Sequence, residues 1–282
     1  MKISNYTLSY SREFTKGQMD IFKFLALSRE LGVEGASIHI RNLQSTDTDY
    51  LKRVRRAYLD HGLSVSQVTV STNFGRSEDR QEEEFKMARE AIRVGMFLGA
   101  PLVRVFAGSP PSEAERERAF AQAGAAVRKV CEEAAREGMP IGLQNHNHGA
   151  LVRTGDEVIR FLKMVDHPNL TFVLDTGQFA GSRGASGKPP PELANADYLE
   201  SIRQTAPLAR YVRVKFYNPR PDGSEPFIDY DKVFAILRSV HYPGFLDIVY
   251  EPGVGTGDPG EEARTAIPRI VKFLRSKMEV GR

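Results

Sequence analysis

The chain has 282 residues, of which 41% are hydrophobic and 27% are charged. Its 39 basic residues exceed its 36 acidic residues so slightly that the balance does not indicate binding to nucleic acid. The single cysteine, Cys131, excludes a disulfide framework and a cysteine-rich metal site. No apolar run approaches the roughly 18 residues of a membrane span, and the N-terminus shows no signal-peptide pattern, so we expect a cytoplasmic protein.

Apolar strand-like runs alternate along the chain with segments of helical periodicity. The predicted strands are residues 2–9, 33–40, 63–70, 101–107, 140–146, 170–175, 210–217 and 244–250. Several intervening helices end in a glycine that would stop the helix in a left-handed conformation, namely Gly32, Gly62, Gly99 and Gly138. Eight such units without a linker predict an α/β fold, a (β/α)8 TIM barrel, as a single domain over residues 1–282. The alternative, a doubly wound open sheet, would usually carry a glycine-rich phosphate fingerprint in its first turn, which residues 10–17 lack.

Two capping boxes predict where helices begin. Thr154 with Glu157, and Ser112 with Glu115, have the spacing at which a hydroxyl and a carboxylate satisfy free backbone N–H groups at a helix N-terminus.

Three connections from a strand to the following helix are long, at residues 176–191, 218–228 and 252–260. Such loops gather at the carboxyl ends of barrel strands, where the active sites of TIM barrels lie. The first is rich in glycine, serine and proline, and it is either a lid over the site or a disordered insertion.

Polar side chains recur on one phase of the predicted strands, the phase that faces the inside of the barrel. Because successive residues of a strand point to opposite sides, Arg213 and Lys215 face inward together, and so do Asp247, Val249 and Glu251. The inward polar set is His39, Arg104, Gln144, His146, Asp175, Arg213, Lys215 and Glu251. Charge at the carboxyl ends of the strands indicates a functional site, and the alternative is a buried ion-pair network that only holds the barrel together.

Short motifs spread over the chain resemble one family. They are Asn73-Phe74-Gly75, the run from Leu98 to Gly108, Gln144-Asn145-His146, Leu174-Asp175-Thr176-Gly177, Val214-Lys215 and Tyr242-Pro243-Gly244-Phe245. On these motifs the chain is similar to the sugar phosphate isomerase/epimerase family of xylose isomerase-like TIM barrels. The resemblance implies an enzyme that moves a proton next to the carbonyl of a small keto sugar, sugar phosphate or sugar acid.

The metal site that the resemblance implies is altered in this sequence. Family members typically bind one divalent cation through a Glu, an Asp, a His or Gln, and a Glu at the ends of strands five to eight. This chain keeps the Asp as Asp175 and has Gln144, Arg213 and Val249 at the other positions, with Gln178 where a His usually follows the Asp. Valine offers no ligand, and the permanently charged guanidinium of arginine has no lone pair to give.

Two alternatives follow for the cofactor. A rearranged site could hold Mn, Mg or Zn on Asp175, Gln144 and Glu251, with His146 beside them. In the other alternative there is no cofactor. Glu251, Asp175 or His146 then acts as the base, and a cation such as Lys215 stabilises an enediolate or, alternatively, forms a Schiff base.

The remaining inward polar residues predict how a substrate is held. The candidate substrate-binding residues are His39, Arg104, Gln144, His148, Arg213 and Gln178. Without a metal, the charges of Arg104, Arg213 and Lys215 exceed those of Asp175 and Glu251, and the mildly positive pocket suits a small sugar acid or sugar phosphate as the partner.

Three other functions remain open. The losses at Gln144 and Val249 also fit a catalytically inactive carbohydrate-binding or regulatory barrel, and a lyase or dehydratase on a related substrate is a further alternative. An abasic-site nuclease needs a three-zinc cluster with many ligands, whereas this chain has six histidines. Exposed barrel helices often pair, so a homo-oligomer is also compatible with the sequence.

Overall fold

Eight parallel strands close into a barrel in a computed structural model of the chain, which describes all residues except 77–79, 148–149, 183–190, 253–259 and 280–282. The strands are β1 Lys2–Tyr6, β2 Gly35–His39, β3 Ser64–Thr69, β4 Val103–Val105, β5 Ile141–Gln144, β6 Leu170–Asp175, β7 Ala209–Phe216 and β8 Phe245–Tyr250. They pair in sequence order, and β8 pairs with β1 to complete the closure. This arrangement confirms the predicted TIM barrel.

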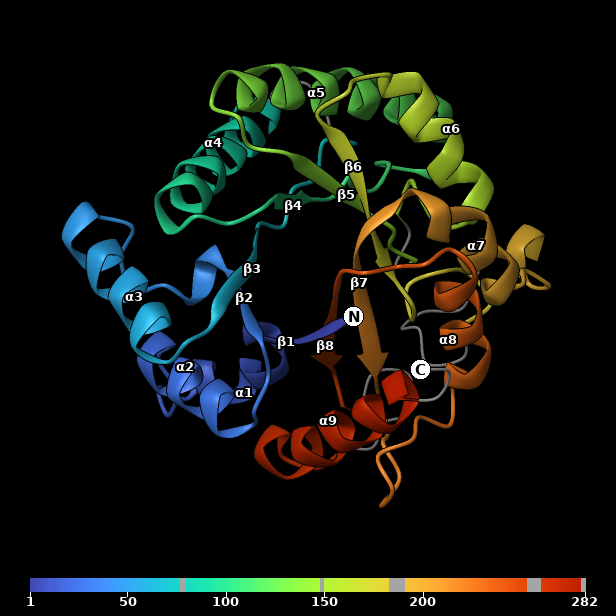
Figure 1. The fold of residues 1–282 in the computed structure, drawn as a ribbon. Helices are drawn as coiled ribbons and strands as arrows, with labels where there is room; N and C mark the ends of the chain where they lie inside the picture. The colour runs from blue at the N-terminus through green and yellow to red at the C-terminus, as the bar shows by residue number, and fades with distance from the viewer. Residues whose placement is uncertain (77–79, 148–149, 183–190, 253–259, 280–282) are drawn as a thin grey trace.

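The helices form a ring around the strands (Figure 1). They are α1 Ser11–Thr15, α2 Ile21–Glu30, α3 Thr48–Asp60, α4 Gln81–Leu98, α5 Arg116–Arg136, α6 Gly155–Val165, α7 Tyr198–Thr205, α8 Tyr230–Ser239 and α9 Ala263–Glu279. The predicted glycine stops are confirmed, because Gly32, Gly62, Gly99 and Gly138 all have a positive φ between 64° and 78°. None of the described helices is long and apolar enough to cross a membrane.

Several strands are shorter than predicted, and the reason is local in β1 and β4. The strand predicted over residues 2–9 ends at Tyr6, because Thr7–Tyr10 coil into a 3-10 turn. The strand predicted over residues 101–107 is reduced to Val103–Val105. Beyond it, the backbone N–H of Phe106 donates to the hydroxyl of Thr72 at 2.9 Å, and that hydroxyl donates to the Phe106 carbonyl at 2.7 Å. The side chain therefore replaces the bonds of a neighbouring strand.

The inside of the barrel is polar well below the strand ends, whereas branched apolar side chains usually fill this space. Ser37 donates to both carboxylate oxygens of Asp247 at 2.8 and 2.9 Å, and Gln67 donates to the same group at 3.3 Å. The Tyr211 hydroxyl donates a hydrogen bond to the Ser66 hydroxyl at 2.8 Å. Since burial raises the pKa of Asp247, this hydrogen-bonded layer offsets the cost of placing a carboxyl group there. It forms the floor on which the candidate site stands.

The two predicted capping boxes have different outcomes. At the start of α6, Glu157 N–H donates to the Thr154 hydroxyl at 3.2 Å, and Thr154 N–H donates to the Glu157 carboxylate at 3.2 Å. The prediction of a capping box at Ser112 is wrong. Residues 113–115 form a 3-10 turn, so α5 begins only at Arg116 and the Ser112 hydroxyl bonds the Glu115 carboxylate instead of a backbone N–H.

This difference gives a prediction about stability. Thr154→Ala removes a backbone cap and should lower the free energy of unfolding by about 1 kcal/mol. Ser112→Ala is the matched control and should change it by less than about 0.5 kcal/mol, because only an exposed hydrogen bond between side chains is lost. Urea denaturation followed by circular dichroism measures both values. Equal losses in the two variants would contradict the assignment of the caps.

Candidate active site

A cavity of about 200 Å³ lies at the carboxyl ends of the strands, inside the ring that the strand ends form. Among the residues singled out from the sequence, those that line it are His39, Arg104, Gln144, His146, Gln178, Arg213, Lys215 and Glu251. Asp175 is fully buried directly beneath them, and His148 lies outside the described residues, as do most of the loop 252–260 and residues 183–190 of the expected lid. The structure therefore brings most of the candidate set to one place.

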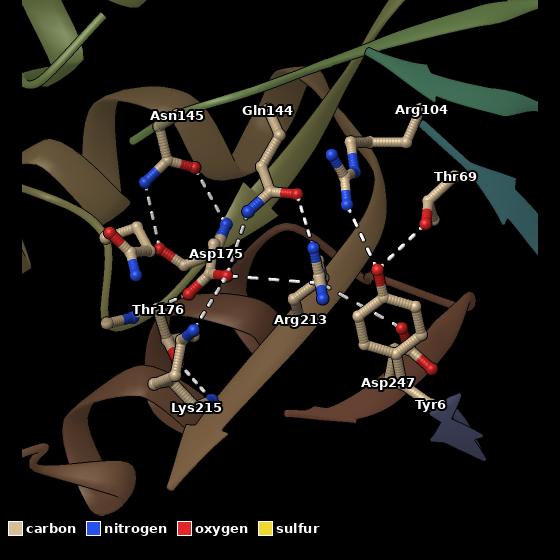
Figure 2. Close-up of polar contacts among 12 residues, drawn as sticks. Tyr6, Thr69, Arg104, Gln144, Asn145, Asp175, Thr176, Arg213, Lys215 and Asp247 are labelled. Carbon is tan, nitrogen blue, oxygen red and sulfur yellow. Dashed lines mark hydrogen bonds and ion pairs between the residues drawn. The ribbon is translucent and has the colours of Figure 1, made fainter. Parts of the chain in front are cut away.

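Asp175, the last residue of β6, is the centre of the polar network (Figure 2). Its Oδ2 accepts a hydrogen bond from Gln144 Nε2 at 3.0 Å, and its Oδ1 accepts one from the backbone N–H of Gly177 at 3.1 Å. Lys215 Nζ lies 3.8 Å from Oδ2. The carboxylate is thus held from three sides by the ends of β5, β6 and β7.

Asn145 fixes the backbone at this centre, a role that strand alternation does not reveal because Asn145 is out of phase with Gln144. Its Nδ2 donates to the carbonyl of Asp175 at 2.9 Å, while Asp175 N–H donates to Asn145 Oδ1 at 2.8 Å. The paired bonds tie the end of β5 to the end of β6. They keep Gln144 and Asp175 in fixed relative positions (Figure 2).

Arg213 lies across the barrel between two buried carboxylates (Figure 2). Its Nε is 4.0 Å from an oxygen of Asp175 and 4.0 Å from an oxygen of Asp247, and its Nη1 donates to Gln144 Oε1 at 2.6 Å. The guanidinium also stacks on Tyr6, with 4.3 Å between its carbon and the ring centroid. Burial would lower the pKa of Arg213, but the surrounding negative charges raise it above its ordinary value, so the cation is permanent.

Lys215 and Glu251 form an ion pair at the mouth of the cavity. The Lys215 side chain is 3% exposed and that of Glu251 is 28% exposed, so the carboxylate is the more open of the two to an incoming molecule. Burial would raise the pKa of Glu251, yet the charge and hydrogen bond of Lys215 bring it below its ordinary value. Glu251 is consequently ionised at neutral pH.

The opposite wall of the cavity comes from the ends of β2, β3 and β4. His39 Nδ1 accepts a hydrogen bond from Arg41 N–H at 3.2 Å, so the proton is on Nε2, which lies 2.9 Å from the Ser71 hydroxyl. Burial and the neighbouring arginines lower the pKa of His39 to about 2, so this imidazole is neutral. Phe106, the residue after β4, packs edge to face on His146, with 5.0 Å between the ring centroids.

Four lining residues were missed from the sequence, for different reasons, and one of them, Leu8, is in the 3-10 turn after β1. Tyr6 follows the inward phase of β1, and alternation from Ser4 would have found it. Arg41 and Ser71 lie after the ends of their strands, where alternation no longer predicts direction.

The residues of the site do not fit the divalent cation of the resembling family. Gln144 Oε1 accepts from Arg213, and the oxygen of Asp175 that faces the cavity is close to two cationic side chains. Val249 is buried and offers no ligand. A guanidinium at a ligand position repels a metal ion. Within the described part of the chain, no group of three or more His, Cys, Asp or Glu side chains could hold a metal ion.

Several solved structures of known proteins share this architecture. D-psicose 3-epimerase from Clostridium cellulolyticum H10 is 16% identical, with a TM-score of 0.76 over 99% of this chain and 100% of that one. D-allulose 3-epimerase from Methylomonas sp. is 17% identical, with a TM-score of 0.74 over 98% of each chain. AsbF from Bacillus anthracis, a probable 3-DHS dehydratase, is 19% identical, with a TM-score of 0.72 over 98% of this chain and 99% of that one. At these identities the likeness shows the fold.

The sequence itself matches one family profile. A search of curated proteins gives no match. The profile described as "Xylose isomerase-like TIM barrel" matches residues 25–277, which is most of the chain. With the closed eight-stranded barrel, this match shows that the chain belongs to the xylose isomerase-like TIM barrel family.

Proposed function

We propose that the protein is an isomerase or epimerase that moves a proton next to the carbonyl of a small keto sugar or sugar acid, without a metal ion. The observation that carries the proposal is the position of Lys215 Nζ, between the carboxylates of Asp175 and Glu251 at the strand ends. An ammonium beside an accessible carboxylate supplies both a base and a positive charge for a developing oxyanion. The names of the similar sugar 3-epimerases support this class of reaction.

In the proposed step, Glu251 removes the proton from the carbon next to the carbonyl. The electron pair of the broken C–H bond moves toward the carbonyl, whose oxygen becomes the negative oxygen of an enediolate. Lys215 stabilises that oxygen from its position over Asp175. When the substrate oxygen draws Lys215 away from Glu251, the carboxylate loses its cationic partner and becomes a stronger base. Return of the proton to the former carbonyl carbon gives an isomer, once the proton of the adjacent hydroxyl group has moved to the enediolate oxygen and left the new carbonyl behind.

Inversion at the same carbon needs a second group that delivers a proton to the opposite face. His146 follows β5, which is separated from β8 by two strands on one side of the barrel and four on the other. We assign it this role of proton donor. Asp175 then has an indirect function, since it holds Lys215 and Arg213 in place, while the other substrate contacts come from His39, Arg104, Gln144 and Gln178.

A second candidate function is a carbohydrate-binding or regulatory barrel without catalysis. It is favoured by one specific observation, that Glu251 is already paired with Lys215. A lyase or dehydratase is the third candidate, and the similarity to the probable dehydratase AsbF is what supports it. The proton-exchange experiment below distinguishes these functions.

Proton exchange tests the proposed function directly. The protein is incubated in deuterated water with a panel of ketoses and keto sugar acids, and deuterium at the carbon next to the carbonyl is followed by NMR. Glu251→Gln keeps the size of the side chain but removes the base, so the exchange rate should fall by about 10² to 10⁴-fold. Glu137→Gln, an exposed residue after α5, is the matched control and should exchange at the wild-type rate. Binding of a sugar without any exchange would favour the binding protein, and loss of water from it would favour the lyase.

Metal content tests the absence of a metal centre. Protein purified without chelators should contain Mn, Mg and Zn only in substoichiometric amounts, because Arg213 and Lys215 supply positive charge beside Asp175. Elemental analysis of the wild type and of Asp175→Ala measures this. A stoichiometric metal that disappears in Asp175→Ala would overturn the metal-free centre.

The pH dependence of the exchange reports on Glu251. The base is active when ionised, so activity should be lost as the pH falls through its folded-state pKa, which lies below the ordinary value of about 4.3. Lys215→Met removes the charge that lowers this pKa and leaves the burial that raises it, so the acidic limb should move to higher pH. NMR titration of the Glu251 carboxyl carbon measures the same shift independently of turnover. An unchanged pKa in Lys215→Met would contradict the pairing.

A further inference from the structure

The wall of the cavity carries more positive than negative charge. Arg41, Arg104, Arg213 and Lys215 line it, and Glu251 is the one carboxylate that does so among the described residues. Counting the buried Asp175 and Asp247 as well sets three carboxylates against four cationic side chains, while His39 adds no charge. Arg41 is exposed to water, whereas Arg104, Arg213 and Lys215 are buried, where a charge without a partner is costly.

Arg104 is the buried cation of this wall that lacks a carboxylate partner in the described part of the chain. It is 2% exposed, and its guanidinium donates to the carbonyl of Val70 at 2.9 Å and to the Tyr6 hydroxyl at 3.1 Å. Its Nε has no hydrogen-bond partner, and no carboxylate lies within 4.0 Å of it in the described part of the chain. Burial and the like charge of Arg213 lower the pKa of Arg104 to about 10, which still leaves it charged at neutral pH. A buried arginine without a carboxylate is expected where a ligand brings the countercharge.

Two arginines and the ion pair of Lys215 with Glu251 lie on different sides of the barrel. Arg104 and Arg41 belong to the ends of β4 and β2, whereas Lys215 and Glu251 belong to β7 and β8. Tyr6 lies between the two sides, bonded to Arg104 through its hydroxyl and stacked on Arg213 through its ring (Figure 2). A molecule that spans the cavity therefore meets the arginines at one end and the proposed acid–base pair at the other.

We propose that the ligand of this cavity is a small sugar derivative with a single carboxylate or phosphate group, which Arg104 and Arg41 hold while its carbonyl faces Lys215. The proposal rests on the proposed function, because it names the substrate class of the same site. Guanidinium groups bind both oxyanions in the same way, through charge-assisted hydrogen bonds. The cavity of about 200 Å³ is smaller than the roughly 300–1,000 Å³ of typical ligand pockets, so the ligand is about the size of one sugar.

Matched pairs of ligands test the oxyanion. Calorimetry compares D-glucuronate with D-glucose, 2-keto-D-gluconate with D-fructose, and D-fructose 6-phosphate with D-fructose, and it includes inorganic phosphate alone. At least one charged member should bind about tenfold or more tightly than its neutral partner, since hydrogen bonds between charged groups are the stronger ones. The pair with the larger difference in affinity shows whether the site prefers a carboxylate or a phosphate. If no charged probe binds more tightly than its neutral counterpart, the proposal is wrong.

Variants assign the preference to the arginines. Arg41→Gln changes an exposed side chain, so it should fold normally and lose about tenfold in affinity for the charged ligand but little for the neutral one. Arg104→Gln should lose at least as much, with thermal denaturation as the check on its folding. Arg55→Gln on the outer face of α3 is the matched control and should bind as the wild type does. Equal losses for charged and neutral ligands in Arg41→Gln would overturn the assignment.

Failure of this inference can be told apart from failure of the proposed function. If a charged sugar binds through Arg104 and Arg41 but exchanges no proton, the oxyanion site stands and the isomerase does not. If a neutral ketose exchanges its proton as efficiently as a charged one, the isomerase stands and the oxyanion site does not.

Discussion

The guanidinium of Arg213, held between Asp175 and Asp247, is the interaction on which the site depends. It lies 4.0 Å from each carboxylate and stacks on Tyr6, so it joins the polar floor of the barrel to the cavity above. Removing either carboxylate would leave a buried charge unbalanced, which is a costly change in a protein interior. The polar layer of Ser37, Gln67 and Asp247 is explained in the same way, because it supports the cation from below.

This arrangement changes what the family's barrel can do. A divalent cation polarises a carbonyl from one point and demands negative ligands around it. Here two side-chain cations, Arg213 and Lys215, are built into β7, and the carboxylates around them are already neutralised. The positive charge is fixed by the fold, and Glu251 remains partly exposed, as the proposed base must be.

Much of the fold and part of the site could be predicted from the sequence. The periodicity of apolar residues and the glycines that end helices predicted the barrel. The alternation of strand residues predicted that Arg213, Lys215 and Glu251 face its inside. The residues beyond strand ends, such as Arg41, escaped because a turn has no fixed period. Asn145 escaped because its side chain acts on the backbone of Asp175, a contact between positions 30 apart that no local pattern encodes. The Ser112 cap failed because a 3-10 turn displaced the start of α5.

A crystal structure of the protein soaked in manganese chloride tests the central claim most directly. Manganese scatters anomalously, so its position can be located without assumptions about the ligands. The account predicts no anomalous peak within coordination distance of Asp175 and an Arg213 guanidinium that remains between Asp175 and Asp247. A manganese ion bound by Asp175 and Glu251, with Arg213 or Lys215 turned away, would contradict it.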